Sequence, residues 1–139
     1  MPDRPIPAMN PSSAIALLRI VTGLLVAPHG IRKLLTGPSQ AIGETIAAKG
    51  LPLPNVLAWL VTIGELSGIL LAVGVATRAA GLIIALTMAG IVAFTQLERL
   101  AQLGTGASVP AEYPLLLAVL GAFFAVLGPT VWSVPFPRR

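Results

Sequence analysis

The sequence predicts an all-α integral membrane protein, a four-helix bundle with a short interfacial helix between its first and second spans. Hydrophobic residues make up 55% of the 139 residues and charged residues only 10%, whereas an average soluble domain has about a quarter charged residues. So few charges cannot cover the surface of a soluble domain of this size. Four apolar runs, separated by stretches rich in Gly and Pro, fit this length if each span takes about 20 residues.

The first span is predicted near residues 13–35, after a flexible, proline-rich tail over residues 1–12. Ser12 or Ser13 is the expected N-cap of this helix, because a serine hydroxyl accepts a bond from the first free backbone N–H groups. A cleaved signal peptide is the alternative interpretation of the region. Arg19 interrupts the apolar run, however, and the run is longer than the apolar core of a signal peptide. We therefore expect a permanent span.

A short amphipathic helix is predicted over residues 40–49. Ile42 and Ile46 lie one helical turn apart, the polar residues fall elsewhere, and Gly50 follows as a C-terminal stop. Such a helix is expected to lie in the membrane interface rather than to cross the bilayer.

The remaining three spans are predicted near residues 54–75, 77–99 and 112–128. Only a two-residue connection separates the second and third apolar runs, so these two spans must be antiparallel neighbours. The second span carries Trp59 near its entrance and Glu65 near its middle.

The chain is predicted to form one transmembrane domain over residues 13–133, followed by a basic tail at 134–139. The positive-inside count gives four basic residues on each side: Arg4, Arg78, Arg138 and Arg139 against Arg32, Lys33, Lys49 and Arg99. Arg19, near the start of the first span, tips the count toward cytoplasmic N- and C-termini.

Several classes of function are excluded or disfavoured by composition. The absence of cysteine excludes disulfide scaffolds, CxxC redox pairs and thiolate metal sites. One histidine and five acidic residues do not predict a metal site, and we find no hydrolase or nucleotide-binding motif. The net charge of +4 comes from basic residues scattered along the chain. We therefore expect contact with anionic lipid headgroups and no nucleic acid partner.

Three ionisable side chains lie within the predicted spans: Arg19, His29 and Glu65. A charge at that depth costs about 2.5 to 3.5 kcal/mol or more, so each group should face the bundle interior and have a partner. Helical rise puts Arg19 about 7 Å, Glu65 about 14 Å and His29 about 22 Å along the membrane normal. We predict that Glu65 lies within salt-bridge or water-bridged reach of Arg19 or His29, and a neutralising Arg19 and Glu65 ion pair is favoured over a ligand or proton site.

A polar vestibule is predicted at one end of the bundle. His29 and Lys33 lie four residues apart on one helix face, and the fourth span begins on the same side of the membrane. The candidate ligand-binding residues are His29, Lys33, Trp59, Glu65, Glu112 and Tyr113. The alternative interpretation is a set of interfacial side chains that extend to the lipid headgroups. No catalytic residue is assigned.

The order of short motifs along the chain resembles the DoxX family over about residues 14–133. These motifs are Leu18-Arg19-Ile20, His29-Gly30 with Lys33, Gly50-Leu51-Pro52, Ala58-Trp59, Glu65 with Gly68, Thr77-Arg78-Ala79-Ala80, Glu112-Tyr113-Pro114 and Gly128-Pro129. The chain departs from the family pattern at Pro28, at Ala111, where glycine is usual, and at Thr130-Val131-Trp132.

The resemblance implies a small four-helix protein of the bacterial inner membrane with cytoplasmic termini, associated with respiration or oxidant defence. Family members include subunits of quinone-linked enzymes and partners in membrane-associated oxidoreductase complexes. The family's polar motif positions correspond to His29, Lys33, Glu65, Glu112 and Tyr113.

Three hypotheses follow. The first is an accessory subunit of a membrane oxidoreductase that binds a quinone- or lipid-like ligand, with a quinone as candidate cofactor and a protein partner or homo-oligomer in the bilayer. The second is a non-enzymatic membrane binding or assembly factor that meets its partner through the GxxxG motif of Gly64 and Gly68. The third, a small transporter, is disfavoured because four helices enclose little space.

Overall fold

The computed structural model describes residues 10–102 and 110–134, and within these ranges it contains helices and no strand. In chain order the elements are α1 (Pro11–Thr36), the π-helical turn η1 (Ser39–Gly43), α2 (Glu44–Ala48), α3 (Pro54–Val73), α4 (Thr77–Ile91), the π-helical turn η2 (Val92–Gln96), the 3-10 helix η3 (Leu97–Gln102) and α5 (Glu112–Leu127). The prediction of an all-α membrane bundle is confirmed.

Three helical segments are long and apolar enough to cross a membrane. They are α1 with 26 residues, α3 with 20 residues, and a continuous 24-residue segment, Thr77–Leu100, which contains α4 and η2. The fourth apolar helix, α5, has 16 residues, a length of about 24 Å at 1.5 Å per residue. Because α5 is shorter than the usual membrane-crossing helix, the fourth span stays a prediction.

The start of α1 differs from the prediction. The side chain of Asn10 accepts a hydrogen bond from the backbone N–H of Ser12 at 3.0 Å, and Pro11 occupies the first helical turn. The predicted caps Ser12 and Ser13 therefore lie inside the helix. Asparagine caps as well as serine does, and proline is favoured at the first helical position, so the helix can begin two residues earlier.

The predicted tails fall mostly outside the described residues. Residues 1–9 of the N-terminal tail and 135–139 of the C-terminal tail are among those that the structure does not describe. The helix predicted at 40–49 is present as η1 followed by α2, with Ile46 buried and Ile42 half-buried. Its position at a membrane interface stays a prediction.

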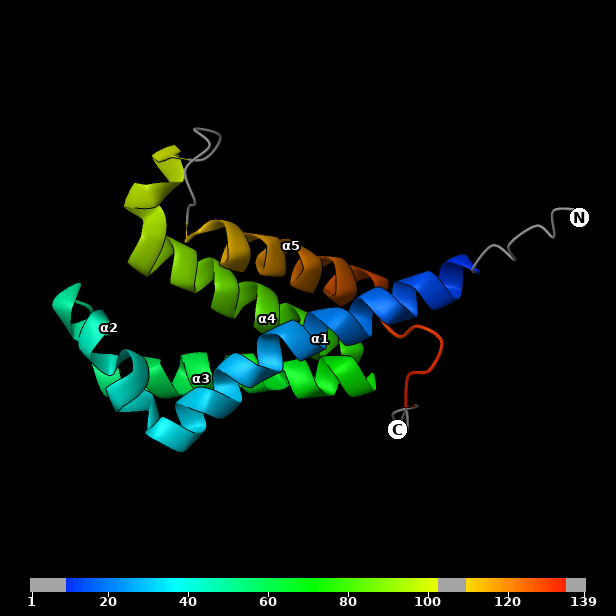
Figure 1. The fold of residues 1–139 in the computed structure, drawn as a ribbon, viewed down its shortest axis with the longest axis horizontal. Helices are drawn as coiled ribbons and strands as arrows, with labels where there is room; N and C mark the ends of the chain where they lie inside the picture. Colours follow the sequence, from blue (N-terminus) through cyan, green and yellow to red (C-terminus); the bar gives the residue numbers. More distant parts are fainter. Residues whose placement is uncertain (1–9, 103–109, 135–139) are drawn as a thin grey trace, which may run out of the picture.

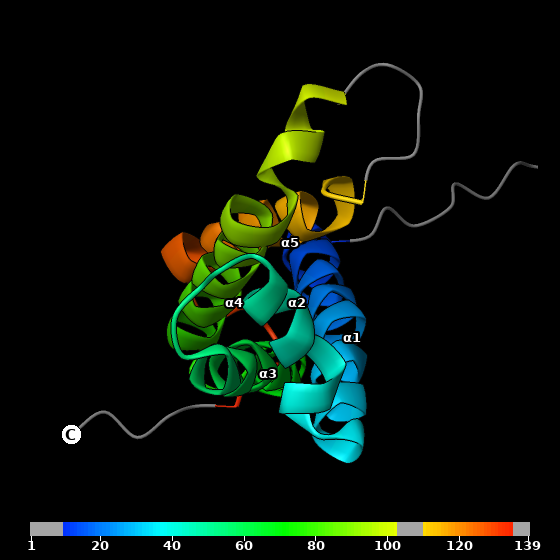
Figure 2. The ribbon, with the colours of Figure 1, turned by 90° about the vertical axis from the view of Figure 1, so that its left-hand side faces the viewer.

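The long helices form two closely packed pairs. α1 lies along α3, and α5 lies along α4, while α3 and α4 join the two pairs (Figures 1 and 2). The tight connection after α3 begins at Gly74, whose φ of 82° lets its N–H cap the carbonyls of Leu70 and Leu71. α1 and α5 contact each other much less than the paired helices do.

Glycines set the closest approach within each pair. A Cβ atom placed on Gly68 would lie 2.8 Å from the backbone N of Ala27 and 2.8 Å from the carbonyl oxygen of Gly23. Gly81 and Gly121 meet in the same way between α4 and α5. The other glycine of the predicted GxxxG motif, Gly64, packs against Thr87 of α4. Both Gly64 and Gly68 are therefore used inside the bundle, and the prediction that this motif meets a partner protein is wrong.

The buried core is apolar and draws on all four long helices. Its members are Val26, Leu71, Ala80, Ile84, Met88, Leu117 and Phe124. The outer faces are apolar too, with large side chains such as Leu24, Leu86 and Val126 more than half exposed. A surface of this kind is suited to lipid, and it agrees with the membrane embedding expected from composition.

Candidate functional site

An ion pair between Lys33 and Glu65 lies at the centre of the candidate site. Glu65, in the middle of α3, is 3% exposed, and its Oε1 lies 2.5 Å from Nζ of Lys33 near the end of α1. The two residues meet because Gly30, one turn before Lys33, packs directly against the backbone of Glu65 and Leu66. The register of the α1 and α3 pair thus places a buried acid beside a lysine.

The predicted Arg19 and Glu65 ion pair is wrong, because the ion-pair partner of Glu65 is Lys33. His29 forms no ion pair with Glu65 among the described residues, but it lines the same cavity. Gly23 packs against Gly68 and Ala72, which places Arg19 one turn further along, level with the end of α3. That position is about two helical turns from Glu65. The predicted depths of these residues along the membrane normal were counted from the end of each helix separately. The glycine contacts set a different offset between α1 and α3.

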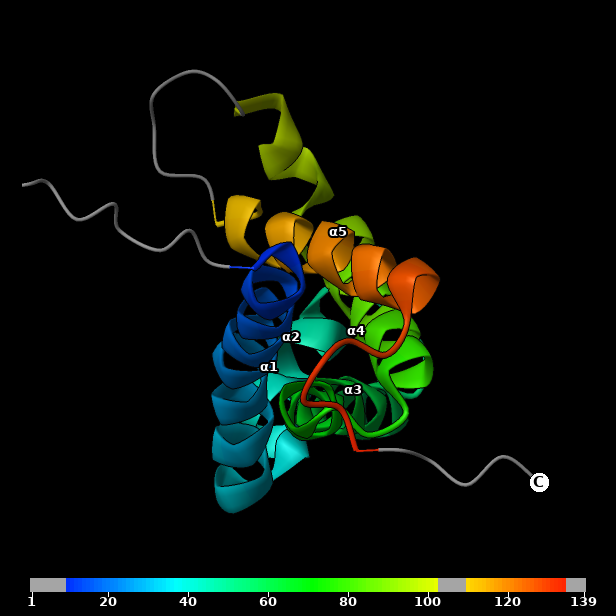
Figure 3. The same ribbon diagram turned by 90° about the vertical axis from the view of Figure 1, so that its right-hand side faces the viewer.

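Arg19 is instead satisfied by neutral oxygens. Its Nη1 donates to the carbonyls of Leu71 at 2.7 Å and Ala72 at 3.1 Å. Its Nε donates to Oγ1 of Thr130 at 3.1 Å, and Nη2 donates to the carbonyl of Trp132 at 3.2 Å. The last carbonyls of a helix lack intrahelical donors and favour a nearby cation. The fully buried guanidinium therefore joins the end of α3 to the segment that follows α5. Figure 3 shows the backbone of that segment as it runs from α5 toward α3.

The second carboxylate oxygen of Glu65 lacks a hydrogen-bond donor among the described residues. Oε2 is buried and accepts no hydrogen bond from any residue that the structure describes. A buried acceptor without a donor is costly, and such groups are rare in folded proteins. Gln96 of η2 has a buried Oε1 in the same state. Both side chains line one cavity, so the cavity holds two unused acceptors.

This polar cavity has a volume of about 320 Å³ and lies between the last turns of α1, the middle of α3, the start of α5 and η2. Its lining is His29, Lys33, Ile42, Thr45, Glu65, Met88, Ile91, Thr95, Gln96, Pro110, Tyr113 and Pro114. The rings of His29 and Tyr113 lie 5.6 Å apart between centroids, at 47° to each other. The Tyr113 hydroxyl donates to the carbonyl of Leu25 at 2.9 Å. Pro28 interrupts the α1 hydrogen-bond ladder in this same turn, which makes nearby carbonyls more accessible.

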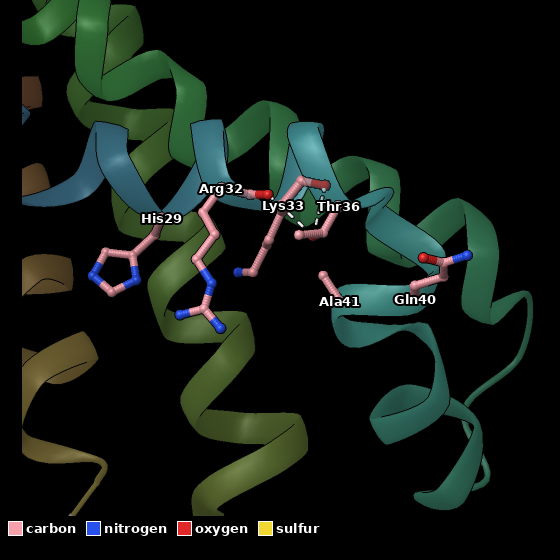
Figure 4. A pocket seen from close by; sticks show the side chains of 6 residues that line it. All are labelled: His29, Arg32, Lys33, Thr36, Gln40 and Ala41. Carbon is pink, nitrogen blue, oxygen red and sulfur yellow. Dashed lines mark hydrogen bonds between the residues drawn. The ribbon is translucent and has the colours of Figure 1, made fainter.

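An outer pocket adjoins the polar cavity. It has a volume of about 410 Å³ and is lined by His29, Arg32, Lys33, Thr36, Gln40 and Ala41 (Figure 4). His29 and Lys33 line both spaces. No acidic side chain belongs to the described lining of the outer pocket, so this mouth carries positive charge from Arg32.

An apolar groove adjoins the polar cavity on another side. It has a volume of about 590 Å³ and runs between α3 and α4, with η1 and α2 at one end. Its walls are mostly aliphatic and include Leu57, Leu60, Ile63, Ile83, Leu86 and Phe94. Ile42, Ile91 and Thr95 line both the groove and the polar cavity. A polar space and an apolar space therefore meet along a shared wall.

The structure brings four of the six predicted ligand-binding residues together: His29, Lys33, Glu65 and Tyr113. Trp59 is 46% exposed on the outer face of α3, and Glu112 is exposed beside Tyr113. Trp59 lies six positions before Glu65 in α3. At 100° per residue, its side chain points about 120° away from the direction of the Glu65 side chain. Neither Trp59 nor Glu112 lines the cavity among the described residues.

Sequence reasoning did not include Thr95 and Gln96 among the ligand-binding residues. Both lie in the π-helical turn η2, and Ile42 lies in η1. A π-helical turn changes the angular phase of the residues that follow, so a count based on 3.6 residues per turn cannot place them.

We expect Glu65→Gln to lower the stability of the fold by less than about 1 kcal/mol, because an amide oxygen still accepts from Lys33. Glu65→Leu should cost about 2 kcal/mol, since it leaves Lys33 without a partner at a side-chain exposure of 17%. Thermal unfolding in mild detergent measures both. Equal stability of the two variants would contradict a stabilising pair.

Comparison with known proteins decides the family. The DoxX family model matches residues 14–97, which is more than half of the chain. The chain belongs to the DoxX family. The match contains Arg19, His29, Lys33 and Glu65, and the DoxX resemblance of the motifs is confirmed.

One curated relative of this DoxX protein supplies a name. Over 135 residues the chain is 31% identical to a Bacillus subtilis (strain 168) protein named "Putative oxidoreductase CatD", with 90% of this chain and 93% of the relative covered. No solved structure matches the chain. The chain is thus a DoxX membrane protein that is similar to a protein named as an oxidoreductase.

Proposed function

We propose that this DoxX protein binds a quinone- or lipid-like ligand as an accessory subunit of a membrane-associated oxidoreductase. The observation that carries the proposal is the shared wall of the polar cavity and the apolar groove, formed by Ile42, Ile91 and Thr95. An amphiphile needs adjoining spaces of this kind for its headgroup and its tail. The volumes of 320 and 590 Å³ lie within the usual range for ligand pockets.

The groups in the polar cavity suit a neutral headgroup with oxygen substituents. Lys33 and Glu65 cancel each other's charge, so the charged residues of the lining give no net charge there. His29 and Tyr113 provide aromatic rings on the wall, and flat rings pack well against aromatic side chains. A quinone-type ring fits these requirements better than an anionic headgroup does.

An accessory role is supported by the composition of the chain and by its relative. The chain has no cysteine for thiol redox chemistry, and the relative is named an oxidoreductase. Electrons would then come from a partner protein, and the ligand would be exchanged at this subunit. The bacterial inner membrane, with both termini cytoplasmic and a protein partner or homo-oligomer, is the setting that we propose.

Binding of a short-chain ubiquinone or menaquinone analogue to the protein in nanodiscs tests the proposal. We expect His29→Ala to weaken binding about fivefold to tenfold, because it removes a polar ring from the cavity wall. Glu112→Ala is the matched control, since Glu112 is exposed and outside the cavity lining.

Two results would contradict quinone binding. One is the absence of binding to the wild-type protein, and the other is unchanged affinity in His29→Ala. Either result favours a non-enzymatic membrane binding or assembly factor. Native mass spectrometry from mild detergent would then be expected to retain a lipid or a protein partner in place of a quinone.

A further inference from the structure

Two hydrogen-bond acceptors of residues that line the polar cavity have no partner among the described residues. Oε2 of Glu65 and Oε1 of Gln96 are buried and receive no hydrogen bond from the described residues. Two of the three hydroxyl groups in the described lining are already engaged: Tyr113 donates to the carbonyl of Leu25, and Thr95 donates to the carbonyl of Ile91. These two hydroxyl groups therefore do not serve the two buried acceptors.

Glu65 is the stronger of these two acceptors. A carboxylate paired with lysine has no proton to donate, and its side chain is 4% exposed. Lys33 is bonded to Oε1, so Oε2 has no donor among the described residues, and Glu65 belongs to the lining of the cavity. A ligand that carries a hydroxyl group could donate to this oxygen with the strength of a charge-assisted hydrogen bond.

We infer that the polar cavity recognises the reduced, dihydroxy form of a quinone-type ligand in preference to the oxidised form. The inference rests on the proposed function, because it concerns the ligand of that same site. One hydroxyl group of a reduced ring donates a hydrogen bond to Oε2 of Glu65. An oxidised ring has only carbonyl oxygens, which leave Oε2 unpaired and place lone pairs opposite it.

The remaining donors of the cavity do not separate the two forms. A further proton of Lys33, or an N–H of His29, can donate to a hydroxyl oxygen or to a carbonyl oxygen. The unpartnered acceptors distinguish the two oxidation states, and Oε2 of Glu65 is the stronger of the two. A site with a buried unpaired polar group disfavours the analogue that cannot satisfy that group.

The experiment compares the dissociation constants of a short-chain ubiquinone and its hydroquinone under anaerobic conditions. The protein is placed in phosphatidylcholine nanodiscs, as wild type and as Glu65→Gln. We expect the wild type to bind the hydroquinone about tenfold more tightly. In Glu65→Gln the amide can turn its NH₂ toward a carbonyl, so the ratio should fall to about one or invert. Glu112→Gln is the matched control and should keep the wild-type ratio.

A second measurement is independent of the variants. Tighter binding of the reduced form raises the midpoint potential of the bound two-electron couple, by about 30 mV for a tenfold preference.

Equal or tighter binding of the oxidised form to the wild type would overturn the inference, because water and not the ligand would then satisfy Glu65. A tenfold preference that persists in Glu65→Gln would overturn it as well. Failure of both forms to bind overturns the proposed function itself, so the two failures are distinguishable.

Discussion

Replacing Arg19 with methionine is expected to lower the stability of the bundle by about 3 to 5 kcal/mol, the largest effect of any change described here. The guanidinium is fully buried and donates four hydrogen bonds that join α1, the end of α3 and the segment after α5. Methionine fills a similar space but donates nothing. The carbonyl of Ala72 would then lose its donor, and the carbonyl of Leu71 would keep only the N–H of Gly74.

Unfolding in mild detergent, followed by heat or by denaturing detergent, measures the loss. Arg19→Lys should recover part of the stability, because an ammonium group can serve the two α3 carbonyls but cannot reach all four acceptors in the geometry of a guanidinium. Arg32→Met is the matched control, since Arg32 is exposed and should tolerate the same change. If Arg19→Met melts at the wild-type temperature, the hydrogen bonds of Arg19 do not stabilise the contact between these helices.

The Arg19 contacts show where sequence reasoning reached its limit. Helix positions follow from apolar runs and from Gly and Pro stops, and α3 begins at Pro54 as predicted. The burial of Arg19 and Glu65 also follows, because lipid cannot solvate a charge. Their partners do not follow, because these depend on the offset between two helices. Small differences in where glycines touch shift that offset by a whole turn.

Sequence reasoning placed some residues of the candidate site together and missed others, because it follows positions along one helix better than contacts between helices. His29 and Lys33 share one face of α1, and a four-residue spacing reveals this directly. Trp59 was expected in the wall of the polar vestibule on the basis of depth alone, yet its angle about the helix axis places it on the outer face. The contribution of Gln96 depends on the π-helical turn η2, which no pattern of residues predicted.

The crossing of α1 and α3 predicts a second large effect. A Cβ atom at Gly68 would lie 2.8 Å from backbone atoms of Ala27 and Gly23. Backbone atoms cannot move aside as side chains do, so Gly68→Ala should separate the helices and lower stability by about 2 to 3 kcal/mol. The same shift would move Gly30 away from Glu65, which loosens the Lys33 ion pair and weakens ligand binding.

Gly90→Ala provides a matched control, since a Cβ atom at Gly90 meets no atom within 4 Å. Both glycines lie within helices, so the same substitution should improve helix propensity equally at the two positions. We therefore expect Gly90→Ala to be as stable as the wild type or more stable, while Gly68→Ala melts earlier. Gly90 lines the apolar groove, so the binding of a quinone analogue to Gly68→Ala, which we expect to be weaker, is compared with the wild type alone. Equal melting of the two variants would mean that α1 and α3 can separate without cost. In that case the glycine contact could not be what holds Lys33 beside Glu65.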